Sequence, residues 1–377
     1  MAAYAARVEI GSGAWCWFAD PRAVVWKGRT LIGWIDGAGD VRVATLDGTT
    51  VTTALLHAGL GVDDHNNPAL LVRADGRLQA FYSAHSGREM YFRLSDDGVL
   101  WDAEQRLGTN TAGPRGYTYP NPVQLAAEGG RFHLFWRGGD WNPAFSTSDD
   151  GLTWAPAQTL IRAPGRPYVK VFSDGADSIH LAFTDGHPRE AATSLYYARY
   201  TNGAWQRADG TPIPGPPFAP RDADLIYDVA RRRHHAWVHD VAVDADGHPR
   251  IVYAVFNSAT DHRYRHAGWT GTKWDDRQLV PAGPFFVEDG GEKQYSGGIS
   301  FDHSDPNVVY LSRQVEGQFE VERWQTADGG RTWTHSALTT RSAEKNVRPV
   351  VARGGDPLWM RGAYLNYTHY RTAIVSG

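Results

Sequence analysis

The segment "STSDDGLTW" (146–154) decides the fold, because related segments recur along the chain at nearly regular intervals. "LSDDGVLW" (94–101) and "QTADGGRTW" (325–333) share its Asp-Gly turn and closing tryptophan, while "RYTNGAW" (199–205) and "GWTGTKW" (268–274) are degenerate copies that keep the tryptophan. The closing tryptophans are 53, 51, 69 and 59 residues apart. Each interval has the length of one β-propeller blade. The Asp and Gly would close a tight turn between two strands and the Trp would pack between sheets, so we interpret the segment as a folding device.

A second repeat runs in phase with the first and consists of an alternating strand, an Asp/Gly turn and a β-branched or aromatic strand. Seven such inner hairpins lie at 20–37, 65–85, 119–139, 166–188, 239–257, 295–314 and 348–367. They predict an all-β fold, a seven-bladed β-propeller of four-stranded antiparallel blades, in which the N-terminal strand completes the last blade. The whole chain, 1–377, would then be a single domain, with the Pro-rich segment 209–225 as a loop between blades four and five.

The composition favours the same fold and narrows the partners. The 41 Gly, 21 Pro, 15 Trp, 17 Tyr and 14 Phe, against 3 Met, are typical of short strands and tight turns. The net charge is −4 and no basic run exceeds the three arginines 231–233, so we expect no nucleic-acid partner. The single cysteine, Cys16, excludes an internal disulfide, and its neighbours Trp15 and Trp17 indicate a packed thiol.

The start of the chain, 1–15, lacks the apolar core of a signal peptide, and no later stretch is long and apolar enough for a membrane helix. We therefore expect no membrane partner. The protein would act in the cytoplasm, or outside it after removal of a leader. We also expect a monomer.

The ends of the inner hairpins predict where the functional face lies. In a propeller the first strand of each blade starts at one rim of the central channel, and the second strand returns to that rim. His65 and His85, at the two ends of one hairpin, should therefore lie side by side. The same ends in the other blades supply His, Tyr and Arg, whereas the opposite ends are ordinary turns. This asymmetry indicates a site that moves protons and binds an anion.

Two reactions could use these residue types. A sialidase-like hydrolase would need an arginine set, which Arg22, Arg137, Arg166 and Arg348 could supply, and a Tyr/Glu pair, for which no convincing glutamate is visible. β-Elimination at a 4-linked uronate would need a cation at the C5 carboxylate, a base for the C5 proton and an acid for the leaving O4. The second reaction fits the rim better. A propeller without catalytic activity that binds glycans is the third alternative.

Beyond these patterns, the sequence resembles the BNR-repeat (Asp-box) proteins that include seven-bladed propeller polysaccharide lyases, the ulvan lyases and rhamnosyl-glucuronate lyases. The resemblance covers nearly the whole chain, and "DDHNNPALLVRADGR" (63–77) followed by "SAH" (83–85) is its most specific part. It also rests on the following segments: "WCWFADPRAV" (15–24), "IGWIDGAGDVRVATLD" (32–47), "YTYPNPV" (117–123), "LFWRGG" (134–139), "FTDGHPRE" (183–190), "HDVAVDADGHPRIVY" (239–253), and the "RPVV" (348–351) and "YLNYTHY" (364–370) of the ending.

The resemblance implies a catalytic set of His65, His85, Tyr119 and Arg137. We expect His85 or Tyr119 to act as base and acid, and Arg137, helped by Asn67 and His65, to bind the carboxylate. Substrate contacts are expected from further rim residues, namely Asn66, Asn67, Tyr117, Arg166, Tyr168, His187, His239, Lys293 and Tyr295. Structural roles stay open for several of these: His65 could cap a turn, His85 could pack against Tyr82 or Tyr91, and Arg137 could pair with Asp140.

The expected substrate is a uronate-containing polysaccharide or oligosaccharide, with glucuronate linked to rhamnose. No cofactor is expected for catalysis and no catalytic metal is predicted, because the chain has no tight His-x-x-x-His spacing with a carboxylate partner. A structural calcium or zinc ion stays open. Segment 206–238 could wall off one end of the cleft, which would favour exo action.

Overall fold

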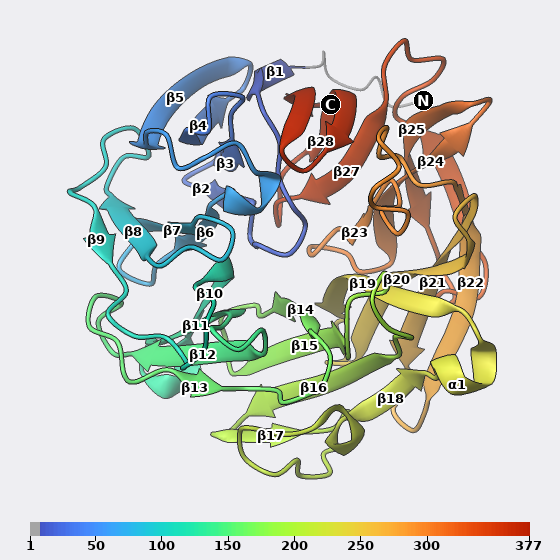
Figure 1. Cartoon of the computed structure of the whole chain (residues 1–377), viewed down its shortest axis with the longest axis horizontal. Coiled ribbons are helices and arrows are strands. Elements are labelled where there is room, and N and C mark those ends of the chain that lie inside the picture. The colour runs from blue at the N-terminus through green and yellow to red at the C-terminus, as the bar shows by residue number, and fades with distance from the viewer. Residues whose placement is uncertain (1–7) are drawn as a thin grey trace.

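The computed structural model describes residues 8–377 and consists of seven antiparallel sheets arranged in a ring (Figure 1). The first seven residues of the opening stretch discussed above lie outside this range. Helical turns are few: η1 (Asp64–Asn66), η2 (Ala126–Glu128), η3 (Pro220–Asp222) and α1 (Val229–Arg232). In the part of the chain that the structure describes, no helix has the length and apolar character needed to cross a membrane.

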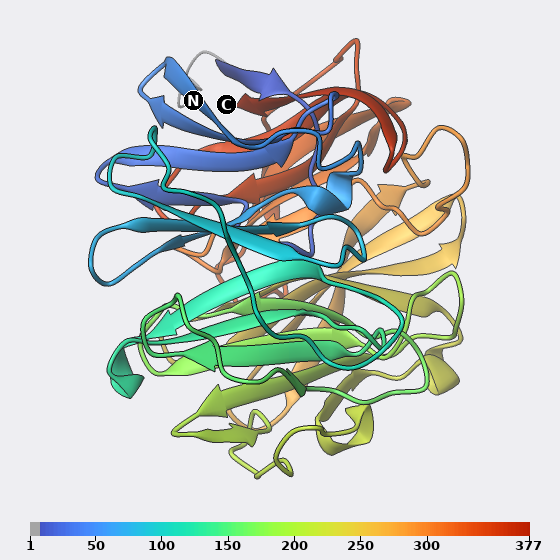
Figure 2. The ribbon, with the colours of Figure 1, turned by 60° about the vertical axis from the view of Figure 1, so that its left-hand side comes forward.

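Each blade is a meander whose strands follow the chain outward from the channel. Blades one to three contain the strands β2 (Ala23–Trp26), β3 (Arg29–Ile35), β4 (Val41–Asp47) and β5 (Thr50–His57); β6 (Ala69–Val72), β7 (Leu78–Ser83), β8 (Met90–Ser95) and β9 (Gln105–Arg106); and β10 (Thr118–Leu125), β11 (Arg131–Arg137), β12 (Pro143–Ser148) and β13 (Gln158–Thr159). Figure 2 turns these blades forward. Blade four contains β14 (Tyr168–Phe172), β15 (Ser178–Thr184), β16 (Leu195–Thr201) and β17 (Ala204–Gln206), with β18 (Asp224–Tyr227) also paired to β16.

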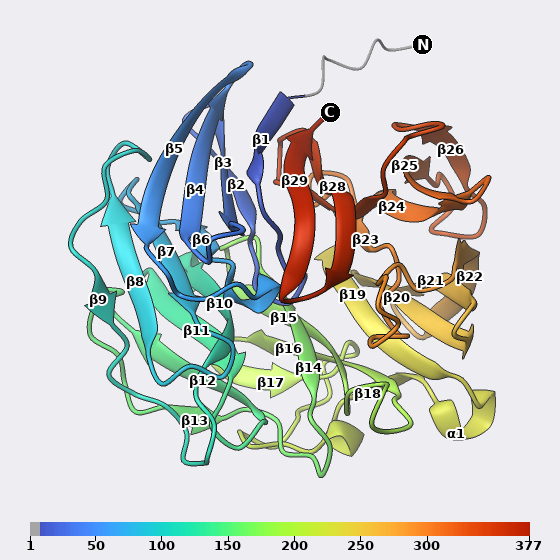
Figure 3. The same ribbon diagram turned by 45° about the horizontal axis from the view of Figure 1, so that its top comes forward.

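Blades five and six repeat this order, and blade seven joins the two ends of the chain. Their strands are β19 (His235–Val243), β20 (Pro249–Ser258), β21 (Asp261–Trp269) and β22 (Trp274–Gly283); β23 (Ile299–Phe301), β24 (Val308–Val315), β25 (Gln318–Gln325) and β26 (Thr334–Ala337); and β27 (Asn346–Val351), β28 (Pro357–Asn366), β29 (His369–Ser376) and β1 (Val8–Ser12). Strand β1 pairs antiparallel with β29, as Figure 3 shows. The prediction that the N-terminal strand closes the last blade is confirmed, as is the seven-bladed fold.

The order of strands follows from the sequence pattern of each hairpin. Strand β7, in the second position of its blade, is buried along its whole length, whereas half of the residues of β5, the outermost strand of blade one, are exposed. Strands that are apolar on both faces must lie between neighbouring blades near the channel, while strands with one polar face can form the edge. The seven predicted hairpins are therefore the inner halves of the seven blades.

The recurring tryptophans pack across the gaps between blades. Trp154 of blade three contacts Phe81 of blade two, Trp205 of blade four contacts Phe135, Trp274 contacts Tyr197, and Trp333 contacts His266. In the turns that precede three of them, an aspartate side chain accepts hydrogen bonds from two following backbone N–H groups; these residues are Asp97, Asp150 and Asp328. The turn fixes the path of the chain so that each tryptophan reaches the preceding blade.

Irregular pairing in three innermost strands changes which side chains face the channel. The register shifts between Thr118 and Asn121 in β10, between Val238 and Asp240 in β19, and between Val347 and Val350 in β27. Tyr119 and Arg348 lie inside two of these bulges with φ of 63° and 52°, in the left-handed region. Bulges of this kind redirect side chains and are common next to active sites.

Candidate active site

A cavity of about 200 Å³ lies at the rim where the two ends of each inner hairpin meet. Its walls come from six blades and from the segment that precedes blade one. The lining residues are Cys16, Trp17, Phe18, His65, His85, Tyr119, Trp141, Arg166, Tyr168, His187, Arg189, Trp237, Glu292, Tyr295 and Tyr367. The cavity is therefore assembled from segments far apart in the sequence, and the closed ring holds them in place.

The two histidines of blade two lie face to face in this cavity. Their rings are stacked, with centroids 4.1 Å apart and planes 7° apart. Asp63 binds both, because its Oδ1 is 2.6 Å from Nδ1 of His65 and its Oδ2 is 3.0 Å from Nδ1 of His85. Asn66 fixes the pair from behind by accepting the His85 backbone N–H and donating to the Gly61 carbonyl. Both imidazoles therefore direct Nδ1 at one carboxylate, which leaves their Nε2 atoms for other partners.

The same geometry gives the two histidines different pKa values and therefore different charges. Burial opposes protonation of His65, but the carboxylates of Asp63 and Asp64 raise its pKa well above the usual value. Burial lowers the pKa of His85 to about 4, and the positive charge on His65 acts in the same direction, outweighing the hydrogen bond to Asp63. At neutral pH the pair is thus one imidazolium and one neutral imidazole. Neighbouring groups whose environments separate their pKa values are typical of acid and base assignments in enzymes.

Tyr119 completes this side of the cavity. Its ring centroid is 5.4 Å from that of His65, and burial raises the pKa of its phenol well above 10. Within the described chain, its hydroxyl makes no hydrogen bond. The phenol is therefore protonated at neutral pH and can donate to a ligand.

Arg137 lies just behind this wall, where three aromatic rings surround its guanidinium. The Cζ atom is 4.9 Å from the ring centroid of Tyr119, 4.8 Å from that of Trp141 and 5.7 Å from that of Tyr168. It donates to the Tyr168 hydroxyl and the Thr118 hydroxyl, and it forms no ion pair with any residue of the described chain. A buried cation without a carboxylate partner leaves positive charge available to an anionic ligand.

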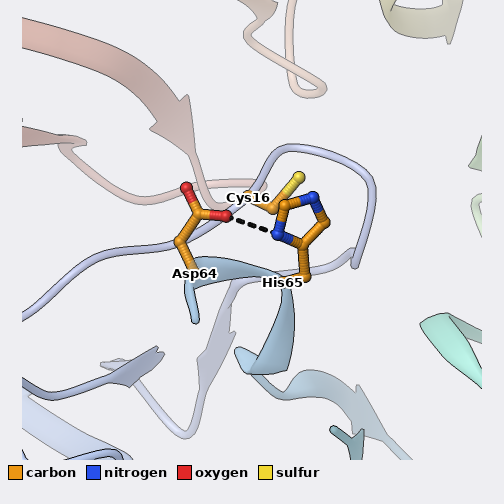
Figure 4. A group of neighbouring side chains, drawn as sticks. All are labelled: Cys16, Asp64 and His65. Carbon is orange, nitrogen blue, oxygen red and sulfur yellow. Dashed lines mark ion pairs between the residues drawn. The ribbon is translucent and has the colours of Figure 1, made fainter. Parts of the chain in front are cut away.

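A buried ion pair holds the turn η1, which carries His65. Arg348 binds Asp64, which also accepts a hydrogen bond from Tyr364, and both charged side chains are almost fully buried. Figure 4 shows Asp64 beside His65, with Oδ1 2.9 Å from Nδ1, and Cys16 next to them. Burial raises the pKa of the Cys16 thiol, as expected for a packed cysteine.

Among residues 8–377, three groups bring His, Cys and Asp atoms close enough for a metal: Cys16 with Asp64 and His65, Asp63 with His65 and His85, and Asp244 with Asp246 and His248. The first fits a cation poorly, because Arg348 already neutralises Asp64. In the second, Asp63 already binds two imidazole nitrogens. In the third, Asp244 accepts from Arg250 and from two backbone N–H groups.

The structure brings seven of the thirteen predicted site residues to the cavity wall: His65, His85, Tyr119, Arg166, Tyr168, His187 and Tyr295. Arg137 is next to it, behind Tyr119 and Tyr168. The surface pairing considered for Arg137 does not occur, because Asp140 instead binds Asn142. The packing of His85 on Tyr82 or Tyr91 does not occur either, since His57 occupies that position.

The other five predicted substrate contacts do not line the cavity. Asn66 and Asn67 use their side chains inside the protein, where Asn67 binds Cys16 and the carbonyls of Ala19 and Pro68. Tyr117 donates to the Thr109 carbonyl, and His239 stacks behind Trp17. Lys293 is exposed outside the cavity. These residues therefore support the site or lie beside it.

The expected wall from segment 206–238 also differs from the structure. Its residues up to 234 line no part of the cavity, because β18 pairs with β16 at the outer edge of blade four. Only Trp237, on β19, reaches the cavity.

Sequence reasoning missed Asp63, Trp141, Arg189, Trp237 and Glu292. Asp63 is the first residue of the segment "DDHNN" (63–67), so its position two residues before His65 could have indicated a contact with the histidines. The other four depend on loop paths or on the bulge in β19, which the repeat does not reveal.

The arginine set expected for a sialidase does not converge. Arg22 pairs with Asp20 and lines a different cavity of about 460 Å³, at the hairpin-turn end of the channel. Arg348 is engaged by Asp64. Only Arg137 and Arg166 lie near each other, on Trp141.

Comparison with known proteins gives a family and a set of similar structures. The family model described as "BNR repeat-containing family member" matches residues 29–282. No curated protein matches the sequence. An ulvan lyase of polysaccharide lyase family PL25, bound to -[GlcA(1-4)Rha3S]-, is similar in structure with a TM-score of 0.75 at 15% identity, covering 98% of this chain and 94% of its own. The polysaccharide lyase Uly1 has a TM-score of 0.64 at 13% identity, with 95% and 89% covered. At these identities the similarity is one of fold.

Proposed function

This chain belongs to the BNR repeat-containing family, and we propose that it is a polysaccharide lyase that cleaves a 4-linked glucuronate by β-elimination. The observation that carries the proposal is the stacked pair of His65 and His85 on Asp63. It places a neutral imidazole and an imidazolium side by side in one cavity. The elimination needs this combination, a base for the C5 proton next to positive charge for the C5 carboxylate.

In the proposed reaction, Nε2 of His85 takes the C5 proton of the glucuronate. Its Nδ1 is held by Asp63, so the free lone pair is on Nε2. A pKa of about 4 keeps this imidazole neutral at neutral pH. The electrons of the C5–H bond are delocalised into the carboxylate as an enediolate, and they form the C4–C5 double bond when the C4–O4 bond breaks.

His65 and Arg137 stabilise the charge that develops on the carboxylate. His65 is positively charged because of Asp63 and Asp64, and Arg137 has no carboxylate partner in the described chain. Fixed charges in a site with little water stabilise an enediolate more than they would in bulk solvent.

Tyr119 then donates its phenolic proton to O4 as the C4–O4 bond breaks. Its raised pKa keeps the phenol protonated at neutral pH, so the proton is available when negative charge develops on O4. In glucuronate the C5 hydrogen and O4 lie on the same face, so His85 and Tyr119 can act from one wall of the cavity. The proton on His85 returns to Tyr119 after product release, so the reaction consumes neither water nor an oxidant.

The proposed substrate is a glucuronate-containing polymer or oligosaccharide with rhamnose next to the cleaved bond. The similar ulvan lyase was bound to a glucuronate and rhamnose sulfate oligosaccharide, which supports this class. Trp141, Trp237 and Tyr295 supply flat apolar surfaces for sugar rings. No step of this mechanism uses a metal, because His65 and Arg137 supply the positive charge.

A retaining or inverting glycosidase is less well supported. Such enzymes need two carboxyl groups flanking the cleaved bond. Among the described residues that line the cavity, Glu292 is the single carboxylic acid, and Asp63 is bound to the two histidines.

The test is to incubate the protein with ulvan, gum arabic and glucuronate oligosaccharides and to follow the ultraviolet absorbance of the unsaturated uronate. The proposal requires a rise in absorbance that His85→Ala and Arg137→Ala abolish. Release of reducing ends without absorbance would instead establish a hydrolase, and neither signal would favour a binding protein.

A further inference from the structure

Glu292 is a charged group in the cavity that the proposed elimination does not use. It lies between β22 of blade five and β23 of blade six, its side chain is nine-tenths buried, and it lines the same cavity as the histidines of blade two. Its Oε1 binds Arg189 of blade four, so the pair links two blades beside Trp237 of blade five. Within the described chain, Oε2 has no hydrogen-bond partner.

The unpartnered oxygen indicates what a ligand must offer at this place. A buried carboxylate oxygen without a donor is unfavourable, so a ligand that supplies hydroxyl donors gains affinity there. Trp237 and Tyr295 form the neighbouring wall, with ring centroids 5.6 Å apart. An aromatic wall beside a hydrogen-bond acceptor is suited to a sugar ring, whose C–H face packs on the rings while its hydroxyls donate to the carboxylate.

The basic residues on this side of the cavity are already neutralised. Arg166 is 2.6 Å from Glu190, and Arg189 binds Glu292 and lies 3.6 Å from Glu190. Two arginines and two glutamates give a net charge of zero. His65 and Arg137 differ from these pairs, because they carry the positive charge assigned to the proposed carboxylate position.

The electrostatic environment of Glu292 agrees with this division of the cavity. Burial raises the pKa of its carboxyl, while the positive charges of Arg189, His65 and Arg166 lower it. A second anion placed against Oε2 of Glu292 would meet a like charge, and Arg189 is already paired with Glu292. A neutral sugar would meet no such repulsion.

We propose that Glu292 selects a neutral, unsulfated sugar next to the cleaved glucuronate, by accepting its hydroxyl protons and repelling a sulfate ester. The inference rests on the proposed function and adds the chemical class of the flanking sugar. It distinguishes this chain from the similar ulvan lyase, which was bound to a 3-sulfated rhamnose repeat.

The test compares one set of glucuronate–rhamnose-3-sulfate oligosaccharides with the same set after chemical desulfation. We expect the kcat/KM of the unmodified protein to be at least about tenfold higher on the desulfated set. The reason is that repulsion between the Glu292 carboxylate and a sulfate ester in a buried site weakens binding. Glu292→Gln keeps the shape of the side chain but removes its charge. It should bring the ratio of kcat/KM on the desulfated set to kcat/KM on the sulfated set close to one. Arg189→Gln leaves the Glu292 charge unpaired and should increase the ratio.

Glu344→Gln is the matched control, because Glu344 pairs with Arg361 away from this cavity, and its ratio should equal that of the unmodified protein. A preference for sulfated substrate, or a ratio that Glu292→Gln does not change, would overturn the assignment. If neither set is cleaved, the lyase proposal fails by itself. The role of Glu292 is then read from the binding of the two sets, followed by tryptophan fluorescence, with the same expected ratios and the same contradicting outcomes.

Discussion

The imidazole rings of His65 and His85 are stacked 4.1 Å apart on the two oxygens of one carboxylate, Asp63. Two positive charges at this distance would repel strongly, so the pair carries one charge. Asp64 decides which ring carries it, since it lies 2.9 Å from Nδ1 of His65. The Arg348 ion pair in turn fixes Asp64 in the interior. The choice of base and cation is thus made by a chain of contacts that reaches blade seven.

Replacing His85 by alanine should lower kcat by about 10²–10⁴-fold, the usual contribution of a positioned general base. The fold should persist, because the side chain is about a quarter exposed and fills no closed core position. The measurement is the initial rate of unsaturated product, with circular dichroism to check the fold. His369→Ala, at the exposed first residue of β29, should keep full activity. Loss of less than about threefold in His85→Ala would remove His85 from the role of base.

The pH dependence of kcat/KM should separate the roles of the two histidines. Activity requires neutral His85, so it should fall as the pH drops through about 4. It also requires protonated His65, so it should fall again as the pH rises through the raised pKa of that group. Asp63→Asn removes a carboxylate that raises the pKa of His65, and the alkaline limb of the profile should therefore move to lower pH.

Asp140→Asn serves as the control for that profile, because Asp140 binds Asn142 at the same rim but neither histidine. Its alkaline limb should coincide with that of the unmodified protein. An unchanged limb in Asp63→Asn would mean that His65 does not need its positive charge for the reaction.

Arg137→Lys should lower kcat/KM by about 10²-fold, the magnitude usual for removal of one preorganised donor to a developing anion. A lysine keeps the charge but cannot reach Tyr168 and Thr118 together as the guanidinium does. Thr118 also accepts the backbone N–H of Ser86, next to His85. Thr118→Val tests whether Arg137 acts only by holding this turn. If Thr118→Val lowers kcat/KM as much as Arg137→Lys does, the guanidinium positions His85 and does not bind the carboxylate.

The fold and the proximity of His65 and His85 were predictable because both follow from repeated local patterns. The Asp-Gly turns mark the blades, and hairpin ends within one blade must meet at one rim. The connecting segments between strands carry Arg189, Glu292 and Trp141. The repeat does not predict where the side chains of these segments point. Trp237 lines the cavity whereas His239, which was expected there, stacks on Trp17, and the register of β19 shifts between Val238 and Asp240. Such bulges leave no clear mark in the sequence.

The turn glycines offer a test of the fold that is independent of catalysis. Gly329 and Gly330 both have positive φ, 73° and 91°, so alanine at either position should cost about 1–2 kcal/mol in the free energy of unfolding. A Cβ on Gly330 would lie 2.4 Å from Nδ1 of buried His266, whereas one on Gly329 would be 3.9 Å from its nearest neighbour, the end of Arg250. Overpacking against a buried ring adds about 1–3 kcal/mol. Denaturant unfolding should therefore place Gly330→Ala below Gly329→Ala in stability by that amount. Equal stabilities would mean that His266 can move away, and that the contact between blades five and six through His266 and Trp333 is looser than their ring distance of 5.5 Å indicates.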